Sequence, residues 1–169
     1  AIRAISFSNP LGSPDLTPRV INVVVNDGTG NSNTAVSTIS INRAPTLDLD
    51  GDNSTASGSN YAVTYTDGGG AVPLADTDIG IADADGTLVG ASVTLTNPKA
   101  GDVLTVGTLP AGITAIVAGN TVSLSGTASP ADYQTALRAI SFSNSSSTPD
   151  TSPRTIEIAV NDGAAVSNV

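Results

Sequence analysis

Short runs in which apolar and polar residues alternate follow one another along most of this chain. Residues 19–26 and 155–161 are rich in Val and Ile and each run into Asn-Asp-Gly, which is typical of a strand that ends in a turn. Alternation over residues 34–42 predicts another strand, and Pro45 beyond it favours a stiff, extended linker. Further strands or extended segments are expected at residues 46–51, 61–65, 71–75, 88–96, 103–106, 113–118, 121–125 and 137–142.

The connections between these runs are short and rich in turn residues. Gly119-Asn120 is typical of a two-residue hairpin loop. Ser129 followed by Pro130 has the pattern of a helix start and predicts one helical turn near residues 133–137. Eight to ten short strands at this spacing predict an all-β fold, an antiparallel Greek-key β-sandwich of the immunoglobulin-like kind, with no helix longer than about two turns. The expected core residues are Ile81, Val93, Leu95, Leu124, Ile140, Phe142, Ile156 and Val160.

One stretch of the chain occurs twice. Residues 1–28 and 136–163 align without a gap at a fixed displacement of 135 positions, with 17 of 28 residues identical. A match at one offset is the sign of a tandem repeat, here with a unit as long as a whole domain. We therefore expect residues 1–43 to be the C-terminal part of a preceding repeat, and residues 44–169 to be a nearly complete repeat that lacks its last strand.

The amino-acid composition limits the kinds of partner and active site that this chain can have. The net charge is −9 and only 6 residues are basic, which argues against a nucleic-acid partner. His, Cys, Met and Trp are absent, so thiol or imidazole catalysis and soft metal sites are excluded. No apolar run approaches the roughly 20 residues of a membrane span, so no membrane insertion is expected. All the acidic residues except Glu157 are Asp, a residue that suits turns and calcium.

Asp pairs provide the contrasting hypothesis of an enzyme. Asp76 with Asp78, or Asp83 with Asp85, are candidate carboxylate pairs for glycoside hydrolysis. Such sites usually need aromatic residues for the sugar rings, and only 3% of this chain is aromatic. We therefore do not expect an enzyme.

Several short motifs resemble those of cadherin repeats. Tyr61 leads a strand that closes at Asp67, and the stretch 81–86 (Ile-Ala-Asp-Ala-Asp-Gly) is similar to the Asp-x-Asp motif of that family. The stretch 132–135 (Asp-Tyr-Gln-Thr) resembles its Leu-Asp-Tyr-Glu-Thr element, and 160–163 its later Asp-Gly turn. The spacing is also similar to the cadherin-related repeats of chondroitin sulfate proteoglycans, and the style is similar to the long arrays of bacterial surface adhesins.

This resemblance implies calcium ions (Ca²⁺) at the junctions between repeats. It places Asp83, Asp85 and Asp162 at the junction with the preceding repeat, with Asp27 as the equivalent of Asp162 one repeat earlier. The ligands implied at the other junction and in the linker are Asp67, Asp132 and Asn42. Gln134 replaces a Glu ligand of the family, and the alternative for all these carboxylates is that they are solvated turn residues.

A separate candidate site follows from spacing alone. Asp48, Asp50 and Asp52 occur at every second position, so an extended chain places their carboxylates along one edge. Like charges this close favour either a bound cation or full solvation. The spacing does not fit an EF-hand. Both a calcium site and a solvated acidic loop remain open for this segment.

The function expected from these observations is structural. The chain is predicted to be a module of a long tandem-repeat protein, extracellular or at the cell surface, stiffened by Ca²⁺ at its repeat junctions. Its expected partners are neighbouring repeats or other copies of the same protein. The alternative is an adhesive module that binds a glycan or protein ligand through loops such as residues 53–60.

Overall fold

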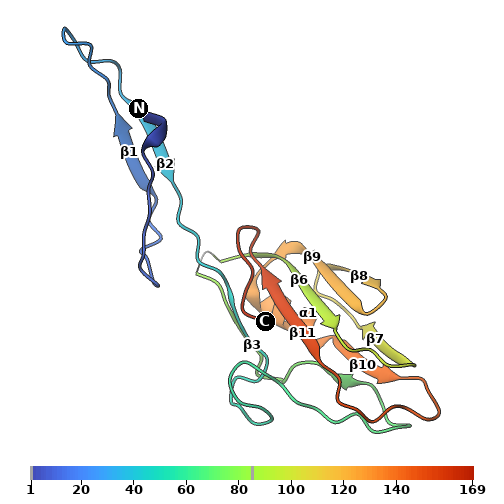
Figure 1. The fold of residues 1–169 in the computed structure, drawn as a ribbon. Helices are drawn as coiled ribbons and strands as arrows, with labels where there is room; N and C mark the ends of the chain where they lie inside the picture. The colour runs from blue at the N-terminus through green and yellow to red at the C-terminus, as the bar shows by residue number, and fades with distance from the viewer. Residues whose placement is uncertain (1, 85) are drawn as a thin grey trace. The chain divides into compact units, whose positions relative to one another are not determined.

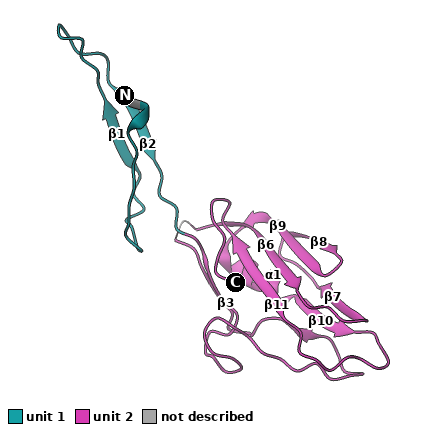
Figure 2. Cartoon of the chain, in the orientation of Figure 1, with its two compact units in different colours: residues 1–43 teal, residues 44–169 magenta. Residues whose placement is uncertain are grey.

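The computed structural model describes residues 2–84 and 86–169. The chain divides into two compact units, Ala1–Arg43 and Ala44–Val169, which are coloured separately in Figure 2. They are called the N-terminal and C-terminal units below. No helix among the described residues is long and apolar enough to cross a membrane.

The N-terminal unit contains a 3₁₀ helix, Ile2–Ala4, and a two-stranded hairpin. Strand β1 (Arg19–Val23) pairs antiparallel with β2 (Ala35–Ile39), from Arg19 opposite Ile39 to Val23 opposite Ala35. Large apolar side chains are exposed throughout this unit. A two-stranded hairpin of this kind is only marginally stable in water without further packing.

The described residues of the C-terminal unit form three antiparallel sheets and one helix (Figure 1). The largest sheet has the strand order β11 (Ile156–Asn161), β6 (Leu88–Leu95), β9 (Thr121–Ala128) and β8 (Thr114–Ala118). The second has the order β4 (Val72–Pro73), β10 (Ile140–Asn144) and β7 (Asp102–Val106), and the smallest pairs β3 (Thr46–Asp48) with β5 (Gly80–Ala82). A mainly β protein with antiparallel sheets is therefore confirmed.

One hydrophobic core runs through the C-terminal unit. Seven of the eight core residues predicted from alternation are buried, and the eighth, Ile156, is half-buried against the same core. The core draws Val93 and Val122 from the largest sheet and Leu104 and Phe142 from the second. Alternation along β6 and β9 thus identified the inward face of each strand correctly.

The helix α1 (Pro130–Arg138) is longer than the single turn predicted. Ser129 is its N-cap and Pro130 occupies the first turn, as expected, while Asp132 and Ser129 form a capping box. Nine residues make about two and a half turns. Consequently β10 begins at Ile140, and the prediction that a strand begins at residue 137 was wrong.

The side chain of Tyr133 ties this helix to the sheet. Tyr133 is fully buried, and its hydroxyl donates to the carbonyl oxygen of Gly126 at 2.6 Å. Gly126 has φ of 136°, and a Cβ there would lie 1.9 Å from the carbonyl oxygen of Gly112. Only glycine fits this close approach of two backbone segments.

Two strand predictions differ from the structure. Residues 61–65 alternate like a strand but form no strand, and Tyr65 is held instead by its side chain. The Tyr65 hydroxyl donates to the carbonyl oxygen of Asn144 at 3.0 Å, and its ring contacts Phe142 edge to face. Conversely, β5 lies where alternation predicts no strand, because three residues are too few for alternation to be visible.

Candidate metal site and repeated turns

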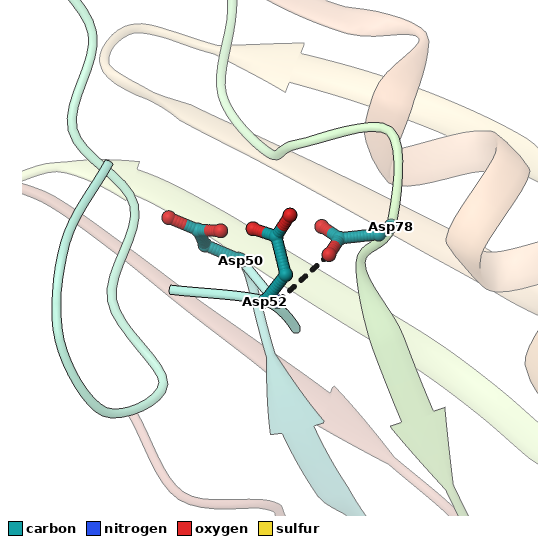
Figure 3. A group of neighbouring side chains, drawn as sticks. All are labelled: Asp50, Asp52 and Asp78. Carbon is teal, nitrogen blue, oxygen red and sulfur yellow. Dashed lines mark hydrogen bonds between the residues drawn. The ribbon is translucent and has the colours of Figure 1, made fainter. Parts of the chain in front are cut away.

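An acidic cluster lies where two loops meet beside the smallest sheet. Asp50 and Asp52 follow β3, Asp78 precedes β5, and the pairing of Asp48 with Gly80 brings the two loops together. One carboxylate oxygen from each of Asp50, Asp52 and Asp78 lies within 4.8 Å of the others. Figure 3 shows the carboxylate of Asp52 between those of Asp50 and Asp78. This cluster could hold a metal ion.

Asp50 organises the loop that follows it. Its side chain is fully buried, and its two oxygens accept hydrogen bonds from the backbone N–H groups of Ser54, Thr55 and Ala56 and from the hydroxyls of Ser54 and Thr55. The shortest is the 2.6 Å bond from the Thr55 hydroxyl. These hydrogen bonds, that of Thr55 foremost, hold the pKa of Asp50 well below its usual range. Asp50 therefore stays ionised at neutral pH.

Asp78 fastens the second loop to the first. Its two carboxylate oxygens accept from the backbone N–H of Gly51 at 3.2 Å and from that of Asp52 at 2.7 Å. The latter bond is drawn in Figure 3. A Cβ at Gly51 would lie 2.9 Å from the carbonyl oxygen of Asp78, so glycine permits this close contact. The two exposed carboxylates, Asp52 and Asp78, are thus fixed side by side.

Among the described residues no basic side chain forms an ion pair with this cluster, since the ion pair there joins Arg154 to Asp102. The Arg138 side chain donates instead to the carbonyl oxygen of Thr77, next to Asp78, at 2.8 Å. Three carboxylates at this separation repel one another unless a cation or water screens them. Oxygen ligands of this kind suit hard cations such as Ca²⁺ and Mg²⁺.

The sequence predicted Asp48, Asp50 and Asp52 as the members of this site. The structure brings Asp50 and Asp52 together with Asp78 instead, while Asp48 accepts the backbone N–H of Asp50 at 3.2 Å. Asp78 was missed because its proximity depends on the pairing of β3 with β5. The signal that could have found it is the acidic stretch 76–78, Asp-Thr-Asp, which was considered only for catalysis.

Asp27 and Asp162 lie in two turns with the same hydrogen bonds. Asp27 Oδ1 accepts from the N–H groups of Thr29 (2.8 Å) and Gly30 (3.0 Å), and Asp162 Oδ1 from those of Ala164 (2.7 Å) and Ala165 (2.6 Å). The side-chain and backbone hydrogen bonds of Thr29 lower the pKa of Asp27 to about 2. Both carboxylates thus have a local role in their turns.

The match between the two turns extends to the residues beyond them. Ser32 donates its N–H to the carbonyl oxygen of Val25 at 2.8 Å, and Ser167 donates to that of Val160 at 2.9 Å. In each turn the serine hydroxyl accepts the N–H of the same strand residue, at 3.0 and 3.1 Å. The sequence repeat is therefore also a repeat of backbone geometry at the same displacement of 135 positions.

The remaining predicted ligands are scattered. Asp132 accepts the hydroxyl of Ser129 at 2.6 Å in the capping box, while Asp67 and Asn42 are exposed and Asp83 is half-buried. Asp85 lies outside the described residues. Among those described, no group of three carboxylates suited to a metal includes Asp27, Asp67, Asp83, Asp132 or Asp162. The junction sites stay a prediction.

Comparison with protein-family models, with curated proteins and with solved structures gives no match for this chain. The likeness to cadherin repeats therefore stays a prediction from its short motifs. What is established is a mainly β fold with antiparallel sheets and one short helix, together with an acidic cluster that could hold a metal ion.

Proposed function

We propose that this chain is a structural module of a tandem-repeat extracellular protein, and that Ca²⁺ stiffens it. The observation that carries the proposal is the turn after β1, whose hydrogen bonds recur 135 residues later in the turn after β11. Repetition of domain-sized units is the way in which chains are built for length. Within this proposal each repeat is a Greek-key sandwich of the cadherin-like kind, which is supported by one core shared between the two larger sheets.

The acidic cluster supplies the calcium part of the proposal. Asp52 and Asp78 are exposed and fixed by the loop backbone, and Asp50 stays ionised beside them. A cation bound there joins the loop after β3 to the loop before β5 and removes the repulsion between the carboxylates. The implied junction ligands Asp83, Asp85 and Asp162 extend this proposal to the contacts between repeats.

Calcium titration by calorimetry, with thermal unfolding in calcium and in chelator, tests the proposal. At a free Ca²⁺ concentration 100 times the dissociation constant, binding to the folded state adds about 2.7 kcal/mol of stability. For a domain of this size that corresponds to a rise in melting temperature of about 5–10 °C. Asp52→Asn combined with Asp78→Asn should abolish the binding at the cluster.

The matched control is Asp83→Asn combined with Asp162→Asn, which leaves the cluster intact. Binding lost only in this control would assign calcium to the junction residues and away from the cluster. A chain that releases no heat with Ca²⁺ and melts identically in chelator would contradict the calcium part of the proposal.

A further inference from the structure

Part of the outer edge of β11 is open. Among the described residues β6 is the only strand that pairs with β11, so β11 is an edge strand of the largest sheet. At its far end Asn161 forms an isolated bridge with Val166, and the carbonyl oxygen of Val160 accepts the N–H of Ser167, so the open part of the edge is residues 154–158. The carbonyl oxygen of Thr155 accepts the N–H of Thr96 at 2.9 Å, so the backbone groups of Thr155 and of every second residue after it face β6. Because these groups alternate along a strand, the N–H and C=O groups of Arg154, Ile156 and Ile158 point to the opposite side.

A groove of about 660 Å³ runs along this open edge. Ile156 and Ile158 of β11 line it on one side, and it is also lined by Tyr61, Tyr65, Val72 and Phe142. The segment 61–65 is the one that alternates like a strand yet has no strand partner. An open row of backbone groups beside an apolar groove is the combination that accepts an added strand.

The N-terminal unit shows which strand belongs there. Residues 19–23 of β1 are the equivalents of residues 154–158 one repeat later. In the N-terminal unit β2 pairs with β1, from Arg19 opposite Ile39 to Val23 opposite Ala35. The turn that leads from β1 toward β2 has its counterpart after β11, where Ser167 already bonds to Val160. The β11 edge therefore has the backbone geometry of a strand that pairs with a β2 sequence.

We propose that the β11 edge accepts residues 35–39 from a second copy of this chain. The incoming strand runs antiparallel to β11, with Ala35 opposite Ile158, Ser37 opposite Ile156 and Ile39 opposite Arg154. Ala35, Ser37 and Ile39 then face the groove, and Val36 and Thr38 face outward. This proposal rests on the tandem-repeat part of the proposed function and not on calcium.

The exchange is favourable because β2 gains cover. In its own unit β2 belongs to a two-stranded hairpin in which Ala35 is exposed and Ile39 is only half-buried, and these are the two apolar residues that would face the groove. Pairing with β11 replaces the same backbone hydrogen bonds and adds the groove as an apolar surface. Each chain carries both a donor strand and an acceptor edge at different places, so the association is head-to-tail and can continue beyond a dimer.

Paired cysteine variants test this arrangement in a chain that has no cysteine of its own. Val20 lies opposite Thr38 in the hairpin, so the equivalent pair between copies is Thr155 with Thr38. By the alternation above this pair is not hydrogen-bonded, and its Cα separation of about 4.5 Å suits a disulfide. All three residues are exposed, so the substitutions should leave the fold intact.

We expect Thr38→Cys chains mixed with Thr155→Cys chains to form a mixed disulfide, in calcium and in chelator alike. Ser37→Cys is the matched control, because its side chain lies on the other face and should not crosslink to Thr155→Cys. A peptide of residues 34–42 should abolish the mixed disulfide. In the double variant Val20→Cys with Thr38→Cys, oxidation locks β2 on β1 and should abolish self-association in sedimentation velocity, and reduction should restore it.

Three outcomes would overturn the proposal. One is equal crosslinking of Thr38→Cys and Ser37→Cys to Thr155→Cys. Another is crosslinking of Thr155→Cys to Val20→Cys in its place, which would show that β1 rather than β2 meets the edge. The third is an unlocked chain that stays monomeric at high micromolar concentration. None of these outcomes depends on calcium binding, so they leave the calcium proposal unaffected.

Discussion

The two copies of the repeated sequence behave alike in one respect and differently in another. Their turns after the Val-rich strand have the same hydrogen bonds. In both turns the aspartate accepts backbone N–H groups, and the serine five residues later donates its N–H to a valine carbonyl oxygen. The segments that open the two copies, residues 1–9 and 136–144, differ sharply in burial, although all but one of their residues are identical. Ile5 is 75% exposed and Phe7 42%, whereas their equivalents Ile140 and Phe142 are 0% and 6% exposed.

The comparison distinguishes structure that depends on nearby residues from structure that depends on partners far away in the sequence. The turn is built from hydrogen bonds between residues two to seven positions apart, so it forms in either setting. The strand at Ile140 and Phe142 pairs with β7 on one side and β4 on the other. In the N-terminal unit the equivalent residues have no such partners among the described residues, and they form no strand.

The largest effect should come from truncating the same aromatic residue in the two copies. Phe142→Ala removes a buried ring that packs against Tyr65, and it should lower the free energy of unfolding by about 3–5 kcal/mol. Phe7→Ala removes an exposed ring and should change it by less than about 0.5 kcal/mol. Urea denaturation followed by circular dichroism measures both. Equal effects would contradict the contrast in burial.

The equivalent arginines provide the next comparison. Arg154 forms an ion pair with the buried carboxylate of Asp102 at 2.7 Å, whereas Arg19 donates to the carbonyl oxygens of Asp15 and Thr17 and forms no ion pair among the described residues. Arg154→Gln leaves Asp102 buried without its cation and should cost about 3 kcal/mol. Arg19→Gln should leave unfolding unchanged in the same denaturation assay. A loss with Arg154→Gln no larger than that with Arg19→Gln would show that the ion pair adds nothing.

Acid should destabilise the C-terminal unit through Asp50 and Asp102. Hydrogen bonds, that of Thr55 foremost, lower the pKa of Asp50. Burial alone would raise the pKa of Asp102, but hydrogen bonds from Arg154, Lys99 and Asn144 outweigh it and leave the pKa lowered. With unfolded pKa values of about 3.9, this stabilisation is complete above about pH 5 and is lost as the pH falls toward the folded values.

Urea denaturation at pH 7, 5 and 3 measures this loss, and carboxyl NMR chemical shifts assign it to residues. The expected result is little change between pH 7 and 5 and a clear decrease by pH 3. In Arg154→Gln the pKa of Asp102 should rise, because burial then acts with less opposition. Constant stability down to pH 3 would contradict these roles for the two carboxylates.

The smallest effects should come from the two repeated turns, and they should be equal. Asp27→Ala and Asp162→Ala each remove the acceptor of two backbone N–H groups. Faster hydrogen exchange is expected at the amides of residues 29–30 in one variant and 164–165 in the other, with little effect elsewhere. NMR exchange rates measure it. Loosening that spreads through the C-terminal unit would mean that Asp162 has a role beyond its turn.

Sequence patterns predicted what depends on neighbours along the chain. Alternation identified strands β6, β8 and β11 and the buried faces of Val93 and Val160. The Ser129-Pro130 pair marked the start of the helix correctly. These features depend on backbone propensity and on the alternation of side chains between the two faces of a strand, and both can be read from residues that are close together in the sequence.

Patterns could not predict which elements become partners. Residues 61–65 have the alternation of a strand, yet a strand also needs a neighbouring edge, and none pairs with them among the described residues. Asp78 joins Asp50 and Asp52 only because β3 pairs with β5. In the same way, nothing near Asp102 in the sequence indicates that its carboxylate will form an ion pair with Arg154.

The central claim is that the repeat continues in space as it does in sequence, with a β2-like strand completing the β11 edge. It is tested most directly by a chain that carries a copy of residues 35–43 after Val169, which continues the period without a gap. Strand addition worth about 2 kcal/mol should raise the melting temperature by about 4–8 °C, and the added strand should occupy the edge that accepts a second copy. The control is a tail of the same composition in scrambled order, which should leave the melting temperature unchanged. Identical melting of the native-order and scrambled tails would contradict the account.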